Sequence, residues 1–537
     1  MNTTHWRRAR LAAVCCAALA ALTLAAAGAT AATAGTRTTA SGSGGAPVVT
    51  TGDGAVRGTT AGTVAEFLGI PYAAPPTGHL RWRPPVPPTG WRGVRDATQF
   101  APSCPQTAGP FAPPGTISED CLYLNVYAPT VGNNDQGGRP VLVWIHGGGL
   151  VQDGARNYDG TKLAATGTVV VTINYRLGAL GFLAHPALAS SPGGAAGNYG
   201  LMDQQAALRW VQRNIARFGG DPENVTIAGE SAGGLSVLAQ LVSSGARGLF
   251  QRAIVQSGTF ALNQRPLATA EAAGQTFATA VGCPDQTAAC LRSVPVSDLV
   301  AKFGVEIPGV VDGAVLTAPI GTALTRGQFA RVPIINGITH DEELLFVEGL
   351  GITVSQGTNI PLAGDPMNAA NYQANIAQAL GVTAARAAAI AIEYPPGTHP
   401  DVAFSLLVSD ASFACPALQV DRWTAARGVP AYAYQFNDDN APVSFLGRSL
   451  GLATHGAELP YLFDLPSTPV VLTPEQQALA ASMQTDWARF AGTGNPSSRA
   501  LPWPSFNGTR VLSLVPLQSQ VTTDFATAHH CAFWAAG

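Results

Sequence analysis

Short, nearly continuous runs of apolar and β-branched residues recur along this chain of 537 residues. Such runs are typical of strands that are covered on both faces of a sheet. Six of them begin at Val141, Thr168, Val225, Ala253, Pro333 and Ala431. Between the second and third runs, residues 200–220 carry apolar side chains at helical spacing, and the segment after Ser231 is also predicted to be helical. Strands that alternate with helices predict an α/β protein with a central, mostly parallel sheet flanked by helices.

The N-terminal segment has a different pattern, in which three arginines precede an apolar stretch and then a series of small residues. This order predicts a secretory signal peptide over residues 1–34, followed by a flexible Gly/Ser/Thr-rich linker over residues 35–46. The alternative is an uncleaved membrane anchor, although the alanine-rich stretch is short for a span. We expect no later segment to be long and apolar enough to cross a membrane. One large domain is expected over residues 47–537.

Composition narrows the class of protein. Apolar residues make up 46% of the chain, enough for a large core, and the formal net charge is −3. A chain so close to neutral gives no electrostatic reason to bind nucleic acid or an anionic membrane. An even number of cysteines follows the predicted signal peptide, which in an exported protein favours disulfides. They are Cys104, Cys121, Cys283, Cys290, Cys415 and Cys531. Since none has the CxxC spacing of zinc sites, we expect no metal.

The candidate chemistry begins at "VTIAGESAGG", where Gly229-Glu230-Ser231-Ala232-Gly233 matches the G-x-S-x-G pattern. A predicted strand precedes this pattern and a predicted helix follows it, as in a nucleophile elbow. The glycines allow a tight turn that leaves the hydroxyl exposed, and the N-terminus of the helix favours negative charge. The pattern is also found in small-residue turns that have no catalytic role. Its place between a strand and a helix favours a nucleophilic serine.

A second glycine-rich segment, "WIHGGGL", follows the strand that begins at Val141. Consecutive glycines can turn backbone N–H groups toward one point. Gly148 and Gly149 are therefore candidates to form an oxyanion hole together with the N–H of Ala232. The alternative is a glycine turn without a role in catalysis.

A serine nucleophile needs a base and an acid, and in this architecture the chain order is serine, acid, histidine. Other histidines are excluded by this order, by proximity to the candidate acids, or by their place in a proline-rich loop or beside the last cysteine. His455, on a glycine-containing turn in "ATHGAELPYLF", remains as the candidate base. Three acidic residues follow the strand at Pro333, and residue chemistry alone does not separate them. They are Asp341, Glu342 and Glu343.

These segments occur in the order found in a known family. "GIPYAAPP", "SEDCLYLNVY", "WIHGGG", "NYRLGALGFL", "FGGDPENVTIAGESAGG", "HDEELLF" and "THGAELPYLF" resemble the signatures of the type B carboxylesterase/lipase family of α/β-hydrolases. The similarity extends from Gly69 to Phe533. It implies an α/β-hydrolase fold with helical insertions over the site, hydrolysis of small-molecule esters, and no cofactor.

The resemblance also assigns roles to individual residues. It implies Ser231 as the nucleophile, Glu342 as the acid, His455 as the base, and Gly148, Gly149 and Ala232 as the oxyanion donors. The disulfide pairs that it implies are Cys104–Cys121, Cys283–Cys290 and Cys415–Cys531.

Three departures from the family pattern bear on function. Glu343 stands where the family has a glycine after the acid, which leaves Asp341 as the alternative acid. Leu150 replaces an aromatic residue that commonly follows the glycines. The loop between Cys104 and Cys121 contains no tryptophan, so a platform for a choline cation is missing. We therefore expect broad use of neutral short- to medium-chain esters and no preference for choline esters.

Other polar residues are expected to support the site. Arg176 and Asp203 are predicted to form a buried ion pair, and Glu230 and Ser257 are candidates to shape the pocket. Two rival functions are an interfacial lipase or sterol esterase, with a candidate lid over residues 349–366, and a non-catalytic binding protein on the same fold. The serine, acid, histidine and glycine loop together favour a secreted serine carboxylesterase. Its oligomeric state is left open.

Overall fold

The computed structural model describes residues 45–536 with eight gaps, namely 110, 131–137, 190–195, 304–308, 351, 356–357, 362–366 and 443–450. The predicted signal peptide, nearly all of the predicted linker and part of the candidate lid lie outside the described residues. The chain from Ala46 onward forms one unit, whose centre is a large sheet.

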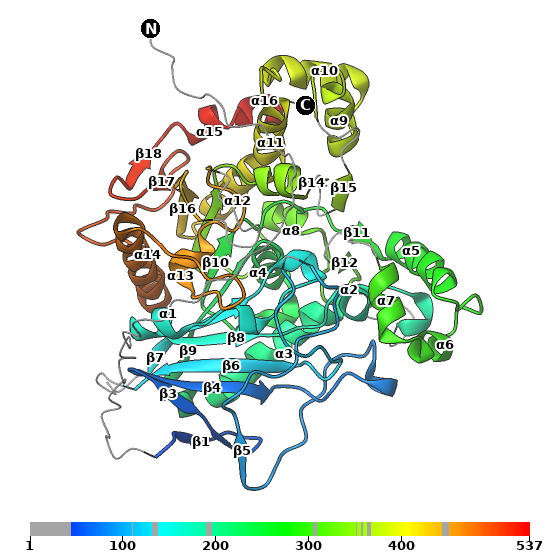
Figure 1. Ribbon diagram of the computed structural model, residues 1–537, viewed down its shortest axis with the longest axis vertical. Helices are drawn as coiled ribbons and strands as arrows, with labels where there is room; N and C mark the ends of the chain where they lie inside the picture. The colour runs from blue at the N-terminus through cyan, green and yellow to red at the C-terminus, as the bar shows by residue number, and fades with distance from the viewer. Residues whose placement is uncertain are drawn as a thin grey trace, which may run out of the picture. The chain divides into compact units, whose positions relative to one another are not determined.

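Among the described residues, the central sheet has eleven strands in the order β18-β17-β16-β13-β10-β9-β7-β8-β6-β4-β3. Its middle strands are the six predicted apolar runs: β7 (Arg139–Ile145), β8 (Val169–Ile173), β9 (Gly220–Glu230), β10 (Arg252–Gln256), β13 (Ile334–Thr339) and β16 (Ala431–Phe436). These strands are parallel to one another, so that Val143 of β7 pairs with Val171 on one side and Ile227 on the other. The predicted mostly parallel sheet is therefore confirmed (Figure 1).

Five further strands of this sheet, within the described part of the chain, lie toward its two edges and are not marked by the apolar pattern. They are β3 (Thr59–Ala61), β4 (Val64–Pro71), β6 (Tyr123–Pro129), β17 (Val511–Leu514) and β18 (Gln520–Thr522). Four of them join the sheet by antiparallel pairing. Polar residues such as Glu66 and Asn125 interrupt their apolar runs, which is why a search for continuous runs does not find them.

Alternate residues of the middle strands point to opposite faces of the sheet. On β7 the odd-numbered residues from Val141 to Ile145 belong to one hydrophobic core, and Leu142 and Trp144 belong to the other. The first core includes α3 (Tyr199–Asn214) and α4 (Ala232–Val242), and the second includes α13 (Leu459–Leu462) and α14 (Pro474–Thr493). Helices thus cover both faces, as predicted, and α3 and α4 are the two helices expected from the sequence.

Helices α9 (Tyr372–Leu380), α10 (Ala384–Glu393) and α11 (Pro400–Ser409) surround a smaller core of their own and stand together at the top of Figure 1. The chain continues from α11 through a π-helical turn, η8 (Asp410–Ala414), into α12 (Cys415–Ala425). The resulting 26-residue helix is long and apolar enough to cross a membrane, contrary to the expectation that no later segment is. Since 67% of its apolar window is buried inside the protein, it is typical of a core helix.

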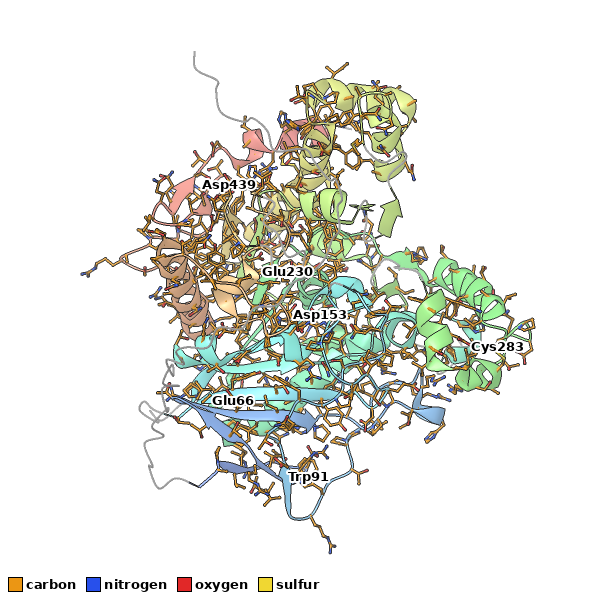
Figure 2. The ribbon with its side chains drawn as sticks, in the orientation of Figure 1. Glu66, Trp91, Asp153, Glu230, Cys283 and Asp439 are labelled. Atoms are coloured by element: carbon orange, nitrogen blue, oxygen red, sulfur yellow. A yellow bond between two sulfur atoms is a disulfide. The ribbon has the colours of Figure 1, made fainter. Side chains whose placement is uncertain are left out.

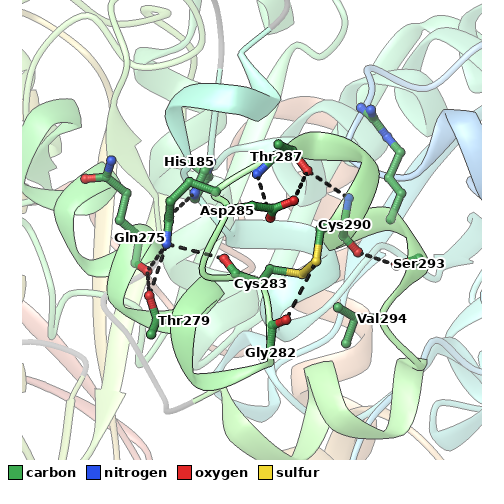
Figure 3. Close-up of a disulfide and its surroundings, with 12 residues drawn as sticks. His185, Gln275, Thr279, Gly282, Cys283, Asp285, Thr287, Cys290, Ser293 and Val294 are labelled. Carbon is green, nitrogen blue, oxygen red and sulfur yellow. Dashed lines mark hydrogen bonds between the residues drawn. A yellow bond between two sulfur atoms is a disulfide. The ribbon is translucent and has the colours of Figure 1, made fainter.

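Disulfides join the six cysteines of the described region in the pairs that the family resemblance implies: Cys104–Cys121, Cys283–Cys290 and Cys415–Cys531. Figure 3 shows the second bridge beside α6 (Ala288–Ser293), where the Thr287 hydroxyl caps the helix by accepting from the Cys290 N–H. Asp285 lies close to the two sulfur atoms and accepts a hydrogen bond from Thr287. Because both sulfur atoms are in a covalent bond, this cluster offers no thiolate to a metal ion.

Candidate active site

Ser231 lies at the sharp turn between β9, which ends at Glu230, and α4, which begins at Ala232. Its backbone has φ 56° and ψ −125°, and a positive φ is uncommon for a residue other than glycine. The serine is half-buried, whereas both of its neighbours are buried. This local geometry is that of a strained elbow, which presents a hydroxyl at the end of a strand.

The glycines on either side permit this turn because backbone atoms approach them closely. A Cβ atom on Gly229 would lie 2.5 Å from the carbonyl carbon of Gly233, and one on Gly233 would lie 2.0 Å from the carbonyl oxygen of Ile145. The N–H of Ser231 donates to the carbonyl oxygen of Gln256 at 2.9 Å. The elbow is therefore held between β7 and β10 by backbone contacts that no larger residue would allow.

The glycine loop after β7 lies next to the elbow at Ser231. A Cβ atom on Gly147 would lie 3.1 Å from the Cβ of Ser231, so the loop passes directly beside the serine. Gly148 and Gly149 have positive φ angles of 75° and 63° and open a short 3₁₀ turn, while Ala232 opens α4. The first N–H groups of a helix have no acceptor within it. The three predicted oxyanion donors thus lie on two segments that meet at Ser231.

Residues that the sequence analysis did not identify hold this loop. Asp153 accepts a hydrogen bond from the Tyr158 hydroxyl at 2.6 Å, and its own N–H and carbonyl each bond the side chain of Gln106 at 2.8 Å. The Tyr175 hydroxyl donates to the carbonyl oxygen of His146 at 2.8 Å. Asp153 and His146 flank the glycines in the sequence, which is the signal that could have found them.

His455 and Glu342 form a buried pair at the ends of the loops that follow β16 and β13. Nδ1 of His455 lies 2.5 Å from Oε2 of Glu342. The other carboxylate oxygen, Oε1, accepts the backbone N–H of Thr339 at 3.0 Å. Both carboxylate oxygens are thus engaged, so the acid is fixed in position and in turn fixes the orientation of the imidazole.

Asp341, the alternative acid, points elsewhere. Its Oδ2 lies 3.1 Å from Nδ1 of His340, and its N–H donates to the carbonyl oxygen of Ala453. Glu343 does not have a positive φ, so the turn after the acid does not require the glycine that the family has there. The N–H of Glu343 donates to Oγ of Ser409 at 3.0 Å. The geometry therefore associates Glu342, rather than Asp341, with His455.

The other nitrogen of His455 faces a carboxylate at the end of β9. Nε2 lies 3.2 Å from Oε1 of Glu230, the residue before Ser231. Among the described residues Nε2 has no hydrogen-bond partner, and in particular none joins it to the Ser231 hydroxyl. Catalytic hydrogen bonds are often long or misaligned without substrate and tighten when it binds. Nε2 of His455 thus faces the carboxylate of the residue that directly precedes the candidate nucleophile in the sequence.

Three carboxyl groups act on this imidazole, those of Glu230, Glu342 and Glu458 (Glu230 is labelled in Figure 2). Burial alone would lower the pKa of His455, but Glu230 and Glu342 outweigh it and raise the pKa to about 9. Burial raises the pKa of Glu230 to about 8 and that of Glu458 to about 7, with Glu342 adding to both. A proton on Glu230 would remove one of the charges that stabilise the imidazolium. The protonation of these groups is therefore linked.

The remaining predicted residues are all buried near these elements. Ser257 follows β10 with a φ of 50°, and its hydroxyl has no partner among the described residues. Leu150 is 2% exposed and packs in the first core. Arg176 and Asp203 form the predicted buried ion pair through two bonds of 2.7 Å, which confirms it. Glu458, which accepts from the side chain of Gln256 at 3.1 Å, was missed although it lies three residues after His455.

A cavity of about 480 Å³ lies away from these residues, between α8 (Ile320–Arg326), α12 and the C-terminal α16 (Cys531–Ala535). Trp423 and Trp534 form part of its wall. None of the residues described above as candidate nucleophile, base, acid or oxyanion donor lines it, so this cavity is not the place where they would act.

A central parallel sheet, helices on both faces and a serine at a strand–helix elbow together define an α/β-hydrolase. The chain belongs to the carboxylesterase family, whose model matches residues 45–534. Members of this family are carboxylic ester hydrolases, and so is this protein.

Three relatives span most of the chain. The human cocaine esterase is 36% identical and aligns with 99% of this chain and 96% of its own length. The pyrethroid hydrolase Ces2e of Rattus norvegicus is 37% identical over 86% of this chain and 85% of its own. The fumonisin B1 esterase of Sphingopyxis macrogoltabida is 37% identical over 85% and 84%. The similarity thus covers the whole hydrolase unit.

Proposed function

We propose that this protein is a secreted serine carboxylesterase in which Ser231 is the nucleophile, His455 the general base and Glu342 the acid that orients it. The observation that carries this proposal is the state of the two imidazole nitrogens. Nδ1 of His455 is held at 2.5 Å by Glu342, whereas Nε2 has no hydrogen-bond partner among the described residues and lies 3.2 Å from Oε1 of Glu230, the residue before Ser231. A general base needs one nitrogen held and the other free.

The reaction proceeds in two halves. His455 Nε2 takes the proton of the Ser231 hydroxyl as its oxygen attacks the ester carbonyl carbon. The N–H groups of Gly148, Gly149 and Ala232 stabilise the oxyanion that forms. The C–O bond to the alcohol then breaks, and His455 returns the proton to the departing alkoxide, leaving an acyl-enzyme. Water attacks this ester by the same route, so that the carboxylic acid leaves and Ser231 regains its proton.

Glu342 stabilises the positive charge that His455 carries between these two transfers, and no metal or cofactor takes part in the proposed cycle. Removing one oxyanion donor from such a site typically costs about 10²–10³ in rate. The glycine loop is therefore expected to contribute substantially to the rate, although losing one of its donors should cost less than losing Ser231 or His455.

Export is supported by the predicted signal peptide and by the three disulfides, since disulfides persist in oxidising compartments. The names of these relatives indicate that they hydrolyse esters of different kinds, namely cocaine, pyrethroids and fumonisin B1. We propose broad use of neutral small-molecule esters for this chain. A lipase or sterol esterase remains the second candidate, because a β-hairpin, β14 (Ile352–Ser355) and β15 (Thr358–Pro361), occupies the candidate lid region.

The experiment that tests the proposal uses an organophosphonate ester probe on the full chain, followed by peptide mapping. Stoichiometric labelling of Ser231, and no labelling of Ser231→Ala, is the expected result. A label on any other serine would contradict the assignment. A panel of neutral esters of increasing chain length then separates the two candidates, since a sharp rise in activity above the solubility limit would favour the lipase.

A further inference from the structure

A second imidazole–carboxylate pair lies outside the proposed triad. Nδ1 of His529 is 2.5 Å from Oδ1 of Asp410, and both side chains are buried. Nε2 of His529 is 2.6 Å from the side-chain nitrogen of Gln435 on β16. Because an amide nitrogen can only donate, Nε2 accepts here and the proton of the neutral imidazole is on Nδ1. This pair has the geometry of the proposed acid–base pair, but both of its nitrogens are occupied.

The hydrogen bonds continue beyond the carboxylate in one direction. Oδ2 of Asp410 accepts from the Tyr394 hydroxyl at 2.7 Å, and that hydroxyl accepts from Nε1 of Trp534 at 2.9 Å. This series of hydrogen bonds therefore joins four separate segments of the protein: β16, η8, the residue after α10, and the C-terminal segment that contains His529 and α16. The Cys415–Cys531 disulfide adds a covalent link, since it joins the start of α12, which directly follows η8, to the start of α16.

Asp410 is the first residue of η8, and the residues around it contact the proposed triad. The ring of Phe413 lies 5.5 Å from the imidazole of His455. Oγ of Ser409 accepts the N–H of Glu343, which directly follows the proposed acid. π-Helical turns inside α-helices are frequent at functional sites. The turn η8 thus contacts the base, and the last residue of α11, directly before it, contacts the loop that carries the acid.

We propose that His529 and Asp410 are positioning residues, which fix η8 and through it hold His455 and the Glu342 loop in their working geometry. This inference rests on the proposed function of His455 and Glu342. His529 is not itself a candidate base, because Gln435 donates to its Nε2 and Asp410 accepts from its Nδ1. Its effect on the reaction passes through Phe413 and Ser409.

The test compares His529→Leu with His529→Asn, using kcat and KM for a neutral short-chain ester and the rate of phosphonylation of Ser231. Leucine fills the space without a donor, whereas the asparagine amide can place a donor near the position of Nδ1. Small misplacement of a catalytic group can cost up to about a hundredfold in rate. We expect His529→Leu to lower kcat at least about tenfold with little change in KM, and His529→Asn to recover most of that loss.

Two controls separate positioning from stability. Leu479→Ala removes a buried side chain of α14 in the second core and should lower Tm without lowering kcat well below Tm. Glu393→Gln removes the partly exposed partner of His530, the neighbour of His529, and should change neither quantity much. Equal kcat for His529→Leu and wild type at a temperature where both are folded would overturn the inference, as would an equal loss in His529→Asn.

A milder variant covers the case in which His529→Leu does not fold. Tyr394→Phe removes one donor to Asp410 and keeps the ring, so a smaller fall in kcat is expected at unchanged KM. No fall would overturn the inference. Failure of the proposed function is distinguishable, because the wild-type protein itself would then not be labelled at Ser231, whereas failure of this inference leaves that label and its rate intact.

Discussion

The two buried imidazole–carboxylate pairs differ in what surrounds them rather than in their own geometry. Both have Nδ1 at 2.5 Å from a carboxylate oxygen. In His529 the second nitrogen, Nε2, accepts a hydrogen bond from the Gln435 amide. In His455 it has no hydrogen-bond partner among the described residues and lies 3.2 Å from Oε1 of Glu230, the residue before Ser231. The comparison teaches that a held imidazole becomes a candidate base only where its other nitrogen is open.

The electrostatic settings of the two pairs also differ. His455 faces the charges of Glu230, Glu342 and Glu458, which raise its pKa above the ordinary value in spite of burial. His529 has one carboxylate partner, and that carboxylate is shared with the Tyr394 hydroxyl. The protonation of His455 therefore depends on the charges of several carboxylates. Each ring nitrogen of His529, in contrast, has one hydrogen-bond partner, Asp410 or Gln435.

The largest effect is expected from removing the reacting groups of the first pair. Ser231→Ala and His455→Ala should each lower kcat by about 10⁵–10⁶, and the double variant should be no worse than either alone, because these groups act as one unit. Steady-state kinetics with a neutral ester would measure this. Additive losses, or activity retained in His455→Ala, would place the base elsewhere.

The two acids offer a direct contrast. Glu342→Gln should lower kcat by about 10⁴, since an amide cannot hold the correct imidazole tautomer or stabilise its charge. Asp410→Asn should lower kcat by only about tenfold, because that residue acts through position. Asp341→Asn is the matched control within the same loop and should remain close to wild type. Loss of activity in Asp341→Asn with an active Glu342→Gln would reverse the choice of acid.

The Cys415–Cys531 disulfide offers a further test of the second imidazole–carboxylate pair, because its two cysteines lie close in sequence to Asp410 and His529. The chain-entropy model assigns about 5 kcal/mol of unfolding free energy to a loop as long as Cys415–Cys531 and about 2 kcal/mol to one as short as Cys283–Cys290. Replacing both cysteines of the long bridge with alanine should lower Tm and also kcat severalfold. The same change in the short bridge should lower only Tm.

Thiol titration of the denatured, unreduced protein provides the starting point for that experiment and should find almost no free sulfhydryl. Two or more free thiols per chain would show that the bridges are not formed in solution. Equal kcat in both double variants, measured well below their Tm values, would show that the long bridge does not support the site.

The smallest expected effect is a shift in pH dependence. The charge of Glu230 raises the pKa of His455, so Glu230→Gln should lower that pKa. The base acts when neutral, and activity is lost as pH falls through its pKa. The acid limb of kcat/KM should therefore move to lower pH in Glu230→Gln and stay in place in Glu393→Gln. An acid limb that moves to higher pH would contradict the proposed environment of His455.

The parts that the sequence determined are those decided by neighbours along the chain. Continuous apolar runs identified the six middle strands, because both faces of each strand are buried. The elbow at Ser231 was predictable because its glycines, strand and helix are consecutive. The edge strands were not found, since a strand such as β6 carries a buried Asn125, whose polarity is satisfied by Thr172 on β8 across the sheet.

The tertiary structure decided the choices that depend on contacts between distant segments. Asp341, Glu342 and Glu343 are chemically alike in the sequence, and folding separates them by direction: one faces His340, one faces His455 and one places its N–H on Ser409. Asp410 and His529 are 119 residues apart, so no local pattern joins them. Neighbours in the sequence determine the local backbone conformation of a residue. The hydrogen-bond partners of its side chain come from distant segments, and so they depend on how the whole chain packs.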